Sequence, residues 1–469
     1  MCKVMVGERT LTARKGERLM ELLVRYGIES PHPCGGRGSC EKCRVLVDGR
    51  EALSCRYVIE GDVTVTLTAA SEIEVTLIEG DCEPLGEGAF FALDVGTTTL
   101  CLSLVSGEGR ELCRVSAQNP QTVFGADVIS RIGQCERSGA ESLRRPLIEK
   151  INKMISAAKA AVGSREPCVR SIYAAGNTTM LHLLLGVDCS GIGRSPYTPV
   201  FLEEKEVSAA DAGICGIEKL ILLPSAHSFV GADVMAGLSL IELGEGYSIF
   251  VDLGTNAEIV LASKDRILCT AAAAGPCFEG SNIDCGMSAL SGAVCSVDID
   301  ESGIRLETVG GGKPKGICAT GLVDAVYSLL KTDVIDEGGY MEGNFYLSDG
   351  VYLSPRDIRN FQLAKSAVHS AIEALLSRAD VGFDRVDALY ISGGFSGKLS
   401  PMRAAAVGLI PLRLSGKCRV IADSCLMGEI KYAMGDRGAV SLAERAEYCD
   451  LSADGVFVTK FIENMSFEI

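Results

Sequence analysis

The chain has 469 residues, of which 47% are hydrophobic and 23% charged, so it is long enough for two to four ordinary globular domains. A formal net charge of −16 argues against binding to nucleic acid or to an anionic membrane, because both need a basic face. No apolar run is long enough for a membrane span and the N-terminus has no apolar core of a secretory signal, so a cytoplasmic protein without a disulfide framework is expected.

The N-terminal segment is expected to form a small β-grasp ferredoxin domain over residues 1–82. Residues 4–14, VMVGERTLTAR, alternate apolar and polar positions around a glycine turn, as in a hairpin. Leucines at helical spacing follow, and Gly27 ends that helix. A cysteine loop, a second hairpin around the Asp48–Gly49 turn and one more strand, VTVTL, complete the order.

Four cysteines gather within this domain with the spacing C-x5-C-x2-C-x11-C. Plant-type [2Fe–2S] ferredoxins use C-x4-C-x2-C…C, and this loop is one residue longer. The glycines of PCGGRGSC let the backbone wrap closely around the sulfurs. A zinc site is the alternative, although only one C-x2-C pair is present where zinc knuckles use two. The predicted [2Fe–2S] ligands are Cys34, Cys40, Cys43 and Cys55.

Residues 83–88, EPLGEG, are predicted to be a linker, after which the sequence contains the same pattern twice. FALDVGTTTLCLSLV is an apolar strand, a tight turn and a second apolar strand. SIFVDLGTNAEIVLA, residues 248–262, has the same order, with Asp252 in the place of Asp94. Further on, ALYISGGFSGKL ends a buried strand at a pair of glycines. The two copies predict an internal duplication, with a first lobe over 89–245 and a second lobe over 246–469.

The two turns have the composition of a nucleotide phosphate site. Glycine permits a tight turn whose backbone N–H groups face outward, and threonine hydroxyls add donors for phosphate oxygens. The leading aspartates, Asp94 and Asp252, can hold Mg²⁺ directly or through water.

The three elements resemble the two phosphate motifs and the adenosine motif of the actin-like ATPase superfamily. That resemblance implies two RNase-H-like lobes, an α/β fold, with bound ATP and Mg²⁺. It also implies a connecting helix at ICATGLVDAV, residues 317–326, where small residues let two helices cross closely. Asp94 and Asp252 would be the catalytic and Mg²⁺-binding residues. The implied nucleotide contacts are Gly96, Thr97, Thr98, Thr99, Gly254, Thr255, Asn256, Gly393 and Gly394.

A ferredoxin domain joined to this ATPase resembles the reductive activators of corrinoid-dependent enzymes. Four further stretches are similar to that family: residues 119–132, 176–186 and 274–287, and the C-terminal FVTKFIENMSF. The resemblance implies that an electron passes from the [2Fe–2S] cluster to inactive Co(II), restoring Co(I), while ATP drives the step. It implies a corrinoid protein or corrinoid methyltransferase as partner and a low-potential electron donor, and it allows a homodimer.

The roles of three groups of residues stay open at this point. Glu279, in GPCFEG, is expected either to contact the nucleotide or the partner, or to cap a helix. Asn177, Thr178 and Thr179 suit a phosphate or partner contact as well as a turn before the apolar helix MLHLLLG. Cys277 and Cys285 are expected to be packed thiols rather than ligands of a second cluster, because no further pair joins them.

Three other functions compete with the activator. A small-molecule kinase of the same superfamily would need a carboxylate base and would leave the ferredoxin domain unexplained. An ATP-driven electron donor to a 2-hydroxyacyl-CoA dehydratase would carry its cluster at a subunit interface, not on a ferredoxin domain. A non-catalytic binding module similar to Hsp70 would make the four cysteines structural.

Overall fold

The computed structural model describes residues 1–7, 9–28, 30, 36, 43–67, 73–78, 88–125, 127–163, 169–280, 282–393 and 398–467. The chain forms two compact units. One consists of Met1–Pro224 with Glu429–Asp436, and the other of Ser225–Gly428 with Arg437–Ile469.

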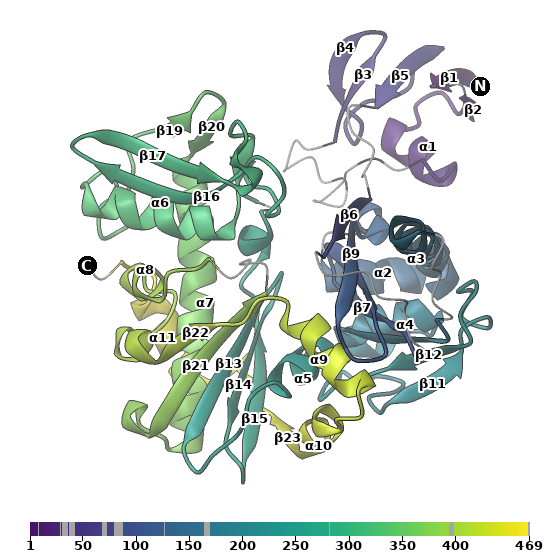
Figure 1. The fold of residues 1–469 in the computed structure, drawn as a ribbon. Helices are drawn as coiled ribbons and strands as arrows, with labels where there is room; N and C mark the ends of the chain where they lie inside the picture. The colour runs from purple at the N-terminus through teal and green to yellow at the C-terminus, as the bar shows by residue number, and fades with distance from the viewer. Residues whose placement is uncertain are drawn as a thin grey trace. The chain divides into compact units, whose positions relative to one another are not determined.

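The N-terminal sheet has five strands in the order β2-β1-β5-β3-β4 (Figure 1). Alternate side chains of β1 are buried, as expected for a sheet with one covered face. Helix α1 (Leu19–Arg25) buries Leu19, Leu22 and Leu23 in the same apolar core. The predicted order of hairpin, helix, hairpin and strand is therefore confirmed. The strands are β1 (Cys2–Val6), β2 (Arg9–Ala13), β3 (Arg44–Val47), β4 (Arg50–Leu53) and β5 (Val63–Leu67).

Strand β6 (Glu74–Leu77) lies in the next sheet, although it precedes the boundary expected at residue 82. It pairs antiparallel with β9 (Glu111–Gln118), with Glu74 opposite Ser116 and Leu77 opposite Cys113. All four of its side chains are exposed. The pairing is made by the backbone alone, and a four-residue strand without a buried face carries no side-chain pattern from which its partner could be predicted.

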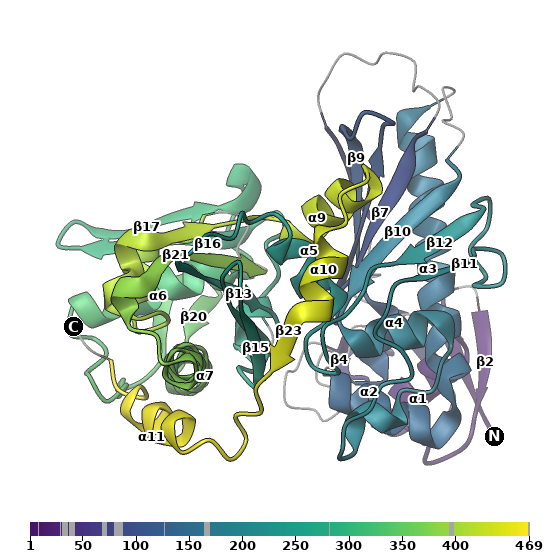
Figure 2. The same cartoon turned by 90° about the horizontal axis from the view of Figure 1, so that it is seen from below.

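The first unit also contains a seven-stranded sheet in the order β11-β12-β10-β7-β8-β9-β6. In Figure 2, β7, β10 and β12 lie side by side, and their pairing is parallel. Helix α3 packs on β9 through an apolar stripe that includes Leu147, Ile151 and Met154. The further elements are β7 (Phe90–Val95), β8 (Thr99–Val105), β10 (Ser171–Gly176), β11 (Lys205–Ser208), β12 (Lys219–Leu222), η1 (Pro120–Val123), α2 (Val128–Ser138), α3 (Ala140–Val162), α4 (Thr178–Leu185) and η2 (Ser190–Gly193).

The second unit contains a six-stranded sheet in the order β22-β21-β13-β14-β15-β23. Helix α7 packs against β14 and β15 (Figure 1). The strands are β13 (Tyr247–Leu253), β14 (Ala257–Ala262), β15 (Ile267–Ala272), β21 (Val386–Gly393), β22 (Cys418–Val420) and β23 (Ala446–Tyr448). The helices are α5 (Ala232–Leu238), η3 (Pro276–Glu279), α7 (Pro355–Ala379), η5 (Phe383–Arg385), η6 (Leu412–Lys417), α10 (Gly438–Arg445) and α11 (Gly455–Glu463). Helix α9 (Ser424–Ala433) begins in this unit, and its residues from Glu429 on belong to the first unit.

Two smaller sheets complete this unit. Helix α6 (Ala319–Lys331) packs on β16, the central strand of the three-stranded one. The remaining elements are β16 (Ala293–Asp300), β17 (Gly303–Thr308), η4 (Val309–Gly311), β18 (Gly316–Ile317), β19 (Phe345–Ser348), β20 (Val351–Leu353) and α8 (Pro401–Ala406).

The two large sheets repeat one strand order, which confirms the predicted duplication. Strands β7, β8 and β9 form an antiparallel meander, and β10 joins β7 in parallel. Strands β13, β14 and β15 form the same meander, and β21 joins β13 in parallel. In both sheets the turn after the first strand follows an aspartate. Among the helices that the structure describes, none is both long and apolar enough to cross a membrane.

Candidate functional site

The cysteine site has two of its four predicted ligands among the described residues. Cys43 and Cys55 are both buried, and their sulfur atoms lie 3.2 Å apart. Cys34 and Cys40 lie outside the described residues. Two converging buried thiols suit a shared metal centre. The residues present therefore fit an iron–sulfur cluster.

Backbone contacts place these thiols. The amide of Ser54 donates to the carbonyl of Cys43 at 2.9 Å, and the amide of Met20 donates to the carbonyl of Ser54 at 3.0 Å. Gly36, in the cysteine loop, has a φ of +78°, and a Cβ there would lie 2.5 Å from the Met20 side chain and 3.9 Å from the Cβ of Cys55. The loop glycine thus allows the chain to pass closely over Met20 and Cys55.

The first predicted phosphate turn lies between β7 and β8. Asp94 is the penultimate residue of β7 and is partly exposed, and Gly96, Thr97 and Thr98 form the turn before Thr99 opens β8. A Cβ at Gly96 would lie 2.4 Å from the carbonyl oxygen of Thr99, so the turn closes tightly only with glycine at that position.

Asn177 reaches this turn from the start of α4. Its side-chain oxygen accepts from the amide of Met180 at 3.0 Å and so caps the helix. Its side-chain nitrogen donates to the Thr97 hydroxyl at 2.8 Å. Thr178 and Thr179 are buried within α4. Asn177 therefore caps the helix, as one interpretation expected, and it also supports the turn, while its contact with a phosphate or a partner stays a prediction.

The second predicted phosphate turn is lined by a carboxylate. The Thr255 hydroxyl donates to Glu279 at 2.7 Å, and the Gly254 amide donates to the carbonyl of Asn256 at 2.9 Å. A Cβ at Gly254 would lie 3.3 Å from the second carboxylate oxygen of Glu279. Glu279 thus belongs to the site of this turn, although it ends the 3-10 helix η3.

Three more carboxylates lie near this turn. Burial, together with the charges of Asp233 and Glu279, raises the pKa of Asp252 to about 7. Burial raises the pKa of Asp233 to about 6, and burial with the charge of Asp233 raises the pKa of Glu258 well above its usual range. Glu258 stands directly opposite Asp252 in the β13–β14 ladder, a position where like charges repel.

Asp233 and Glu258 were not predicted from the sequence as residues of the site. Each has a signal in hindsight, because each is a charged residue inside an otherwise apolar element, VGADVMAGL and AEIVLA. Such a carboxylate group attracts a cation, since a positive ion would offset the repulsion. Among the described residues, however, no three acidic, histidine or cysteine side chains converge closely enough to hold a metal ion by themselves.

The predicted adenosine motif ends β21. Gly393 has a φ of +103°, and a Cβ there would lie 2.2 Å from the carbonyl oxygen of Leu253 at the end of β13. The hydroxyls of Ser392 and Ser424 share a hydrogen bond of 2.5 Å. Gly394 lies outside the described residues. Glycine at 393 therefore allows the adenosine strand to end against the second phosphate strand.

The expectation that ICATGLVDAV forms a close helix crossing was wrong. Gly321 of α6 faces a strand, since a Cβ there would lie 2.2 Å from the carbonyl oxygen of Val294 in β16. The close helix crossing is made by α5 and α9, where a Cβ at Gly428 would lie 2.2 Å from the carbonyl oxygen of Ala236. Small residues occur in both segments, and only the fold decides which of them meets another helix.

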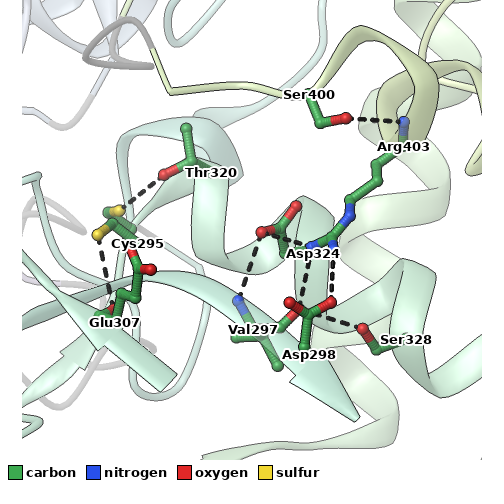
Figure 3. Close-up of polar contacts among 10 residues, drawn as sticks. Cys295, Val297, Asp298, Glu307, Thr320, Asp324, Ser328, Ser400 and Arg403 are labelled. Carbon is green, nitrogen blue, oxygen red and sulfur yellow. Dashed lines mark hydrogen bonds and ion pairs between the residues drawn. The ribbon is translucent and has the colours of Figure 1, made fainter. Parts of the chain in front are cut away.

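An ion-pair network holds the segment that follows the adenosine motif (Figure 3). The Arg403 guanidinium on α8 donates to Asp298 at 2.5 Å and to Asp324 at 2.8 Å. It also donates to the carbonyl of Val297 at 3.1 Å, and the Ser400 hydroxyl caps α8. Arg403 thereby joins α8 to β16 and α6.

The cysteines outside the cluster site mostly behave as packed thiols. Cys277 is buried, which raises its pKa, and Cys285 donates to the carbonyl of Gly350 at 3.5 Å. No metal-binding group includes either residue within the part of the chain that the structure describes. Ten of the described thiols beyond the cluster pair are buried.

Three family models match consecutive parts of the chain. They are described as a 2Fe-2S iron-sulfur cluster binding domain over residues 3–69, the RACo middle region over 90–245, and the C-terminal domain of RACo, the ASKHA domain, over 246–469.

The similar proteins include two curated relatives and one solved structure. The corrinoid activation enzyme RamQ of Eubacterium limosum is 26% identical over 80% of this chain and 70% of its own length. The [Co(II) methylated amine-specific corrinoid protein] reductase of Methanosarcina barkeri is 23% identical over 68% of this chain and 65% of its own, so the chain spans less than two thirds of that relative. A reductive activator for corrinoid, iron-sulfur protein has a TM-score of 0.75 and 25% identity, and the match covers 100% of this chain and 98% of that structure.

Proposed function

The chain belongs to the family of RACo-type reductive activators of corrinoid-dependent enzymes, and on that premise we propose that it uses ATP to restore a corrinoid protein from Co(II) to Co(I). The bound iron–sulfur cluster supplies one electron at a time to this reaction. The observation that carries the proposal is the union, in one chain, of a buried thiol pair in a ferredoxin fold and a duplicated ATPase fold.

The side chains of the protein would bind the cluster and the nucleotide, and they would not themselves be oxidised or reduced. Cys43 and Cys55, with Cys34 and Cys40 from the same loop, would hold the cluster. Asp94 and Asp252 would face the Mg²⁺ ion of bound MgATP. The nucleotide would contact the two phosphate turns and the glycines of the adenosine strand, and Glu279 would act at the second turn through its contact with Thr255. No histidine is required for this chemistry.

ATP is needed because reduction to Co(I) is uphill from ordinary cellular donors. In a one-electron step each 59 mV uphill costs about 1.4 kcal/mol. A nucleotide can offset that cost only if its ATP-bound and ADP-bound states differ in their affinity for the partner or in the cobalt ligation they favour. The implied partners are a corrinoid protein or methyltransferase and a low-potential electron donor, and a homodimer is one arrangement in which the activator would work.

An anaerobic assay tests this function. Dithionite-reduced protein is mixed with a Co(II) corrinoid protein from the same genome, with and without MgATP, and Co(I) is followed by its absorbance. Formation of Co(I) only with MgATP is expected. Cys55→Ala should abolish it, because it removes a buried thiol of the cluster site, whereas Cys215→Ala, which removes an exposed thiol, should not.

A different outcome would change the assignment. If the reduced protein hydrolyses MgATP but no corrinoid protein yields Co(I), the corrinoid partner is wrong, and a kinase or another electron acceptor becomes the better proposal. Equal rates of Co(I) formation with and without MgATP would remove the role of the ATPase fold.

A further inference from the structure

Three consecutive carbonyl groups of the first phosphate turn accept hydrogen bonds from two buried residues, Asn119 and Arg131. The side-chain nitrogen of Asn119 donates to the carbonyl of Gly96 at 2.8 Å. The Arg131 guanidinium donates to the carbonyl of Thr97 at 2.5 Å. The backbone amide of Asn119 donates to the carbonyl of Thr98 at 2.8 Å. Each peptide of the turn therefore has its oxygen fixed by a donor from the segment 119–131.

Both side chains come from inside the unit. Asn119 and Arg131 have no solvent-exposed surface. The guanidinium also donates to the carbonyl of Gly125 at 3.1 Å and to the side-chain oxygen of Gln121 at 3.4 Å, and it lies 3.0 Å from the sulfur of Met180. A buried guanidinium is costly unless its donors are satisfied, so these bonds lock its position.

The geometry of the peptide bond then decides where the amides of the turn point. In a trans peptide the C=O and N–H groups point in opposite directions. Because the oxygens of Gly96 and Thr97 point toward the buried donors, the N–H groups of Thr97 and Thr98 point away from them. Successive N–H groups that face the same way form a concave site for an anion.

The Thr97 side chain completes this arrangement. Its hydroxyl oxygen accepts a hydrogen bond from the side-chain nitrogen of Asn177 at 2.8 Å. A hydroxyl whose oxygen already accepts can still donate its hydrogen to a further acceptor. The turn thus presents donors, and phosphate oxygens are acceptors.

The second turn is chemically different from the first. There Thr255 donates to a carboxylate, Glu279, and Asp233, Asp252 and Glu258 lie close by with raised pKa values. Each turn follows an aspartate, but only the first has a buried guanidinium behind its backbone, and only the second has a glutamate on its threonine. The two copies of the duplicated motif therefore differ in the groups that support them, although both are proposed to contact the nucleotide.

We propose that Asn119 and Arg131 are positioning residues that hold the first turn in its phosphate-binding form, for the β- and γ-phosphates of a nucleoside triphosphate. The inference rests on the proposed function, because it assumes that this turn meets the nucleotide. Neither residue contacts the ligand. They act through the backbone of residues 96–98, so their removal should weaken recognition of the phosphates and spare recognition of the nucleoside.

The test compares ligands that differ in their phosphates. ATP, ADP and adenosine are titrated calorimetrically into the full-length protein carrying its cluster. Arg131→Gln should weaken ATP binding about tenfold or more, as expected for a lost charge-assisted hydrogen bond, while adenosine binding changes less than about twofold. Arg131→Lys keeps the positive charge but not the planar set of guanidinium donors, so its ATP affinity should lie between those of wild type and Arg131→Gln. Arg137→Gln is the matched control, because Arg137 is an exposed residue of the same helix that bonds Gln134.

The outcomes separate this inference from the proposed function. If wild-type protein does not bind ATP, the proposed function fails. If wild type binds ATP and a folded Arg131→Gln protein binds it equally well, or loses ATP and adenosine binding alike, only the positioning role fails. Should Arg131→Gln not fold, Arg131→Lys decides, and unchanged ATP affinity in that variant overturns the inference.

Discussion

At the scale of single residues, Gly36 is a described position of the cysteine loop where a side chain would not fit. Its φ of +78° costs an L-residue about 1–2 kcal/mol, and an added Cβ would lie 2.5 Å from Met20. We expect Gly36→Ala to lower the cluster content of the purified protein, measured as iron per chain and visible absorbance.

Gly49 provides the matched control for that substitution. Its φ is also +78°, but nothing lies within 4 Å of an added Cβ. Gly49→Ala should therefore keep its cluster, and adding Met20→Ala to Gly36→Ala should restore part of the lost content. Equal losses in Gly36→Ala and Gly49→Ala would show that backbone strain, and not the contact with Met20, sets the effect.

A second residue, His182, is expected to make the free energy of unfolding depend on pH. It is fully buried, stacks on Phe201, accepts the Val200 amide at 3.0 Å and contacts the carbonyl of Thr178 at 2.7 Å. The first bond requires an unprotonated nitrogen, and burial lowers the pKa of the imidazole below its usual 6.5. The unfolded chain therefore takes up a proton before the folded one does as pH falls.

Stability should accordingly decrease as pH falls below about 6.5, and it should be retained above that value. Urea unfolding between pH 5 and 7.5 measures this dependence. His182→Gln keeps a donor and an acceptor but does not titrate, so its free energy of unfolding should vary less over the same range. An identical pH dependence in the variant would assign the effect to other groups.

At the scale of elements, Arg403 ties helix α8 to strand β16 and to helix α6 (Figure 3). Its side chain is 22% exposed and that of its partner Asp324 is 11% exposed. Removing one member of a largely buried ion pair leaves the other charge uncompensated, at a cost of about 3 kcal/mol. We expect Arg403→Gln to lower the free energy of unfolding by about that amount, measured in urea.

The pair Arg305–Asp300 on the same sheet supplies a comparison. Both side chains are exposed, by 59% and 45%, and solvent screens their charges, so Arg305→Gln should lower the free energy of unfolding much less than Arg403→Gln does. If the two variants lose the same stability, burial does not distinguish these ion pairs.

The elements also show where prediction from sequence succeeds. Local sequence patterns, such as FALDVGTTT and SIFVDLGTN, predicted these strands and turns. The repetition of that pattern predicted the duplication. The residues that support the turns could not be predicted in this way. Arg131 lies far from Thr97 along the chain, and its role at the turn is evident only from their hydrogen bond. The helix crossing at Gly428 was misplaced for the same reason, since ICATGLVDAV has equally small residues but faces a strand.

At the scale of the whole molecule, β6 determines where the chain can be divided. Because β6 pairs with β9, a fragment that begins at residue 83 lacks a strand of the seven-stranded sheet, whereas one that begins at residue 73 keeps it. We expect the fragment 83–469 to unfold at lower urea concentration than 73–469. The backbone amides of Arg114 and Ser116, which face Thr76 and Glu74 of β6, should also exchange hydrogen faster in the shorter fragment, because β9 becomes an edge strand.

The N-terminal sheet has a core of its own, so the complementary fragment 1–72 should take up the same cluster as the full chain. Its visible spectrum, compared with that of the intact protein, checks this. Equal urea midpoints for 73–469 and 83–469 would mean that β6 contributes no measurable stability to the ATPase part.

The position of β6 also sets the length of the tether between the redox domain and the ATPase. Strand β5 ends at Leu67 and β6 begins at Glu74, so only six residues join the two sheets. The linker expected from the sequence ended at residue 88 and would have made this connection much longer. A fully extended connection of that length spans at most about 25 Å. On the proposed function, this upper limit would leave the electron-carrying domain with a short reach. The protein that holds the cobalt would then have to bring the metal to the ferredoxin domain, so the encounter would depend on docking between the two proteins.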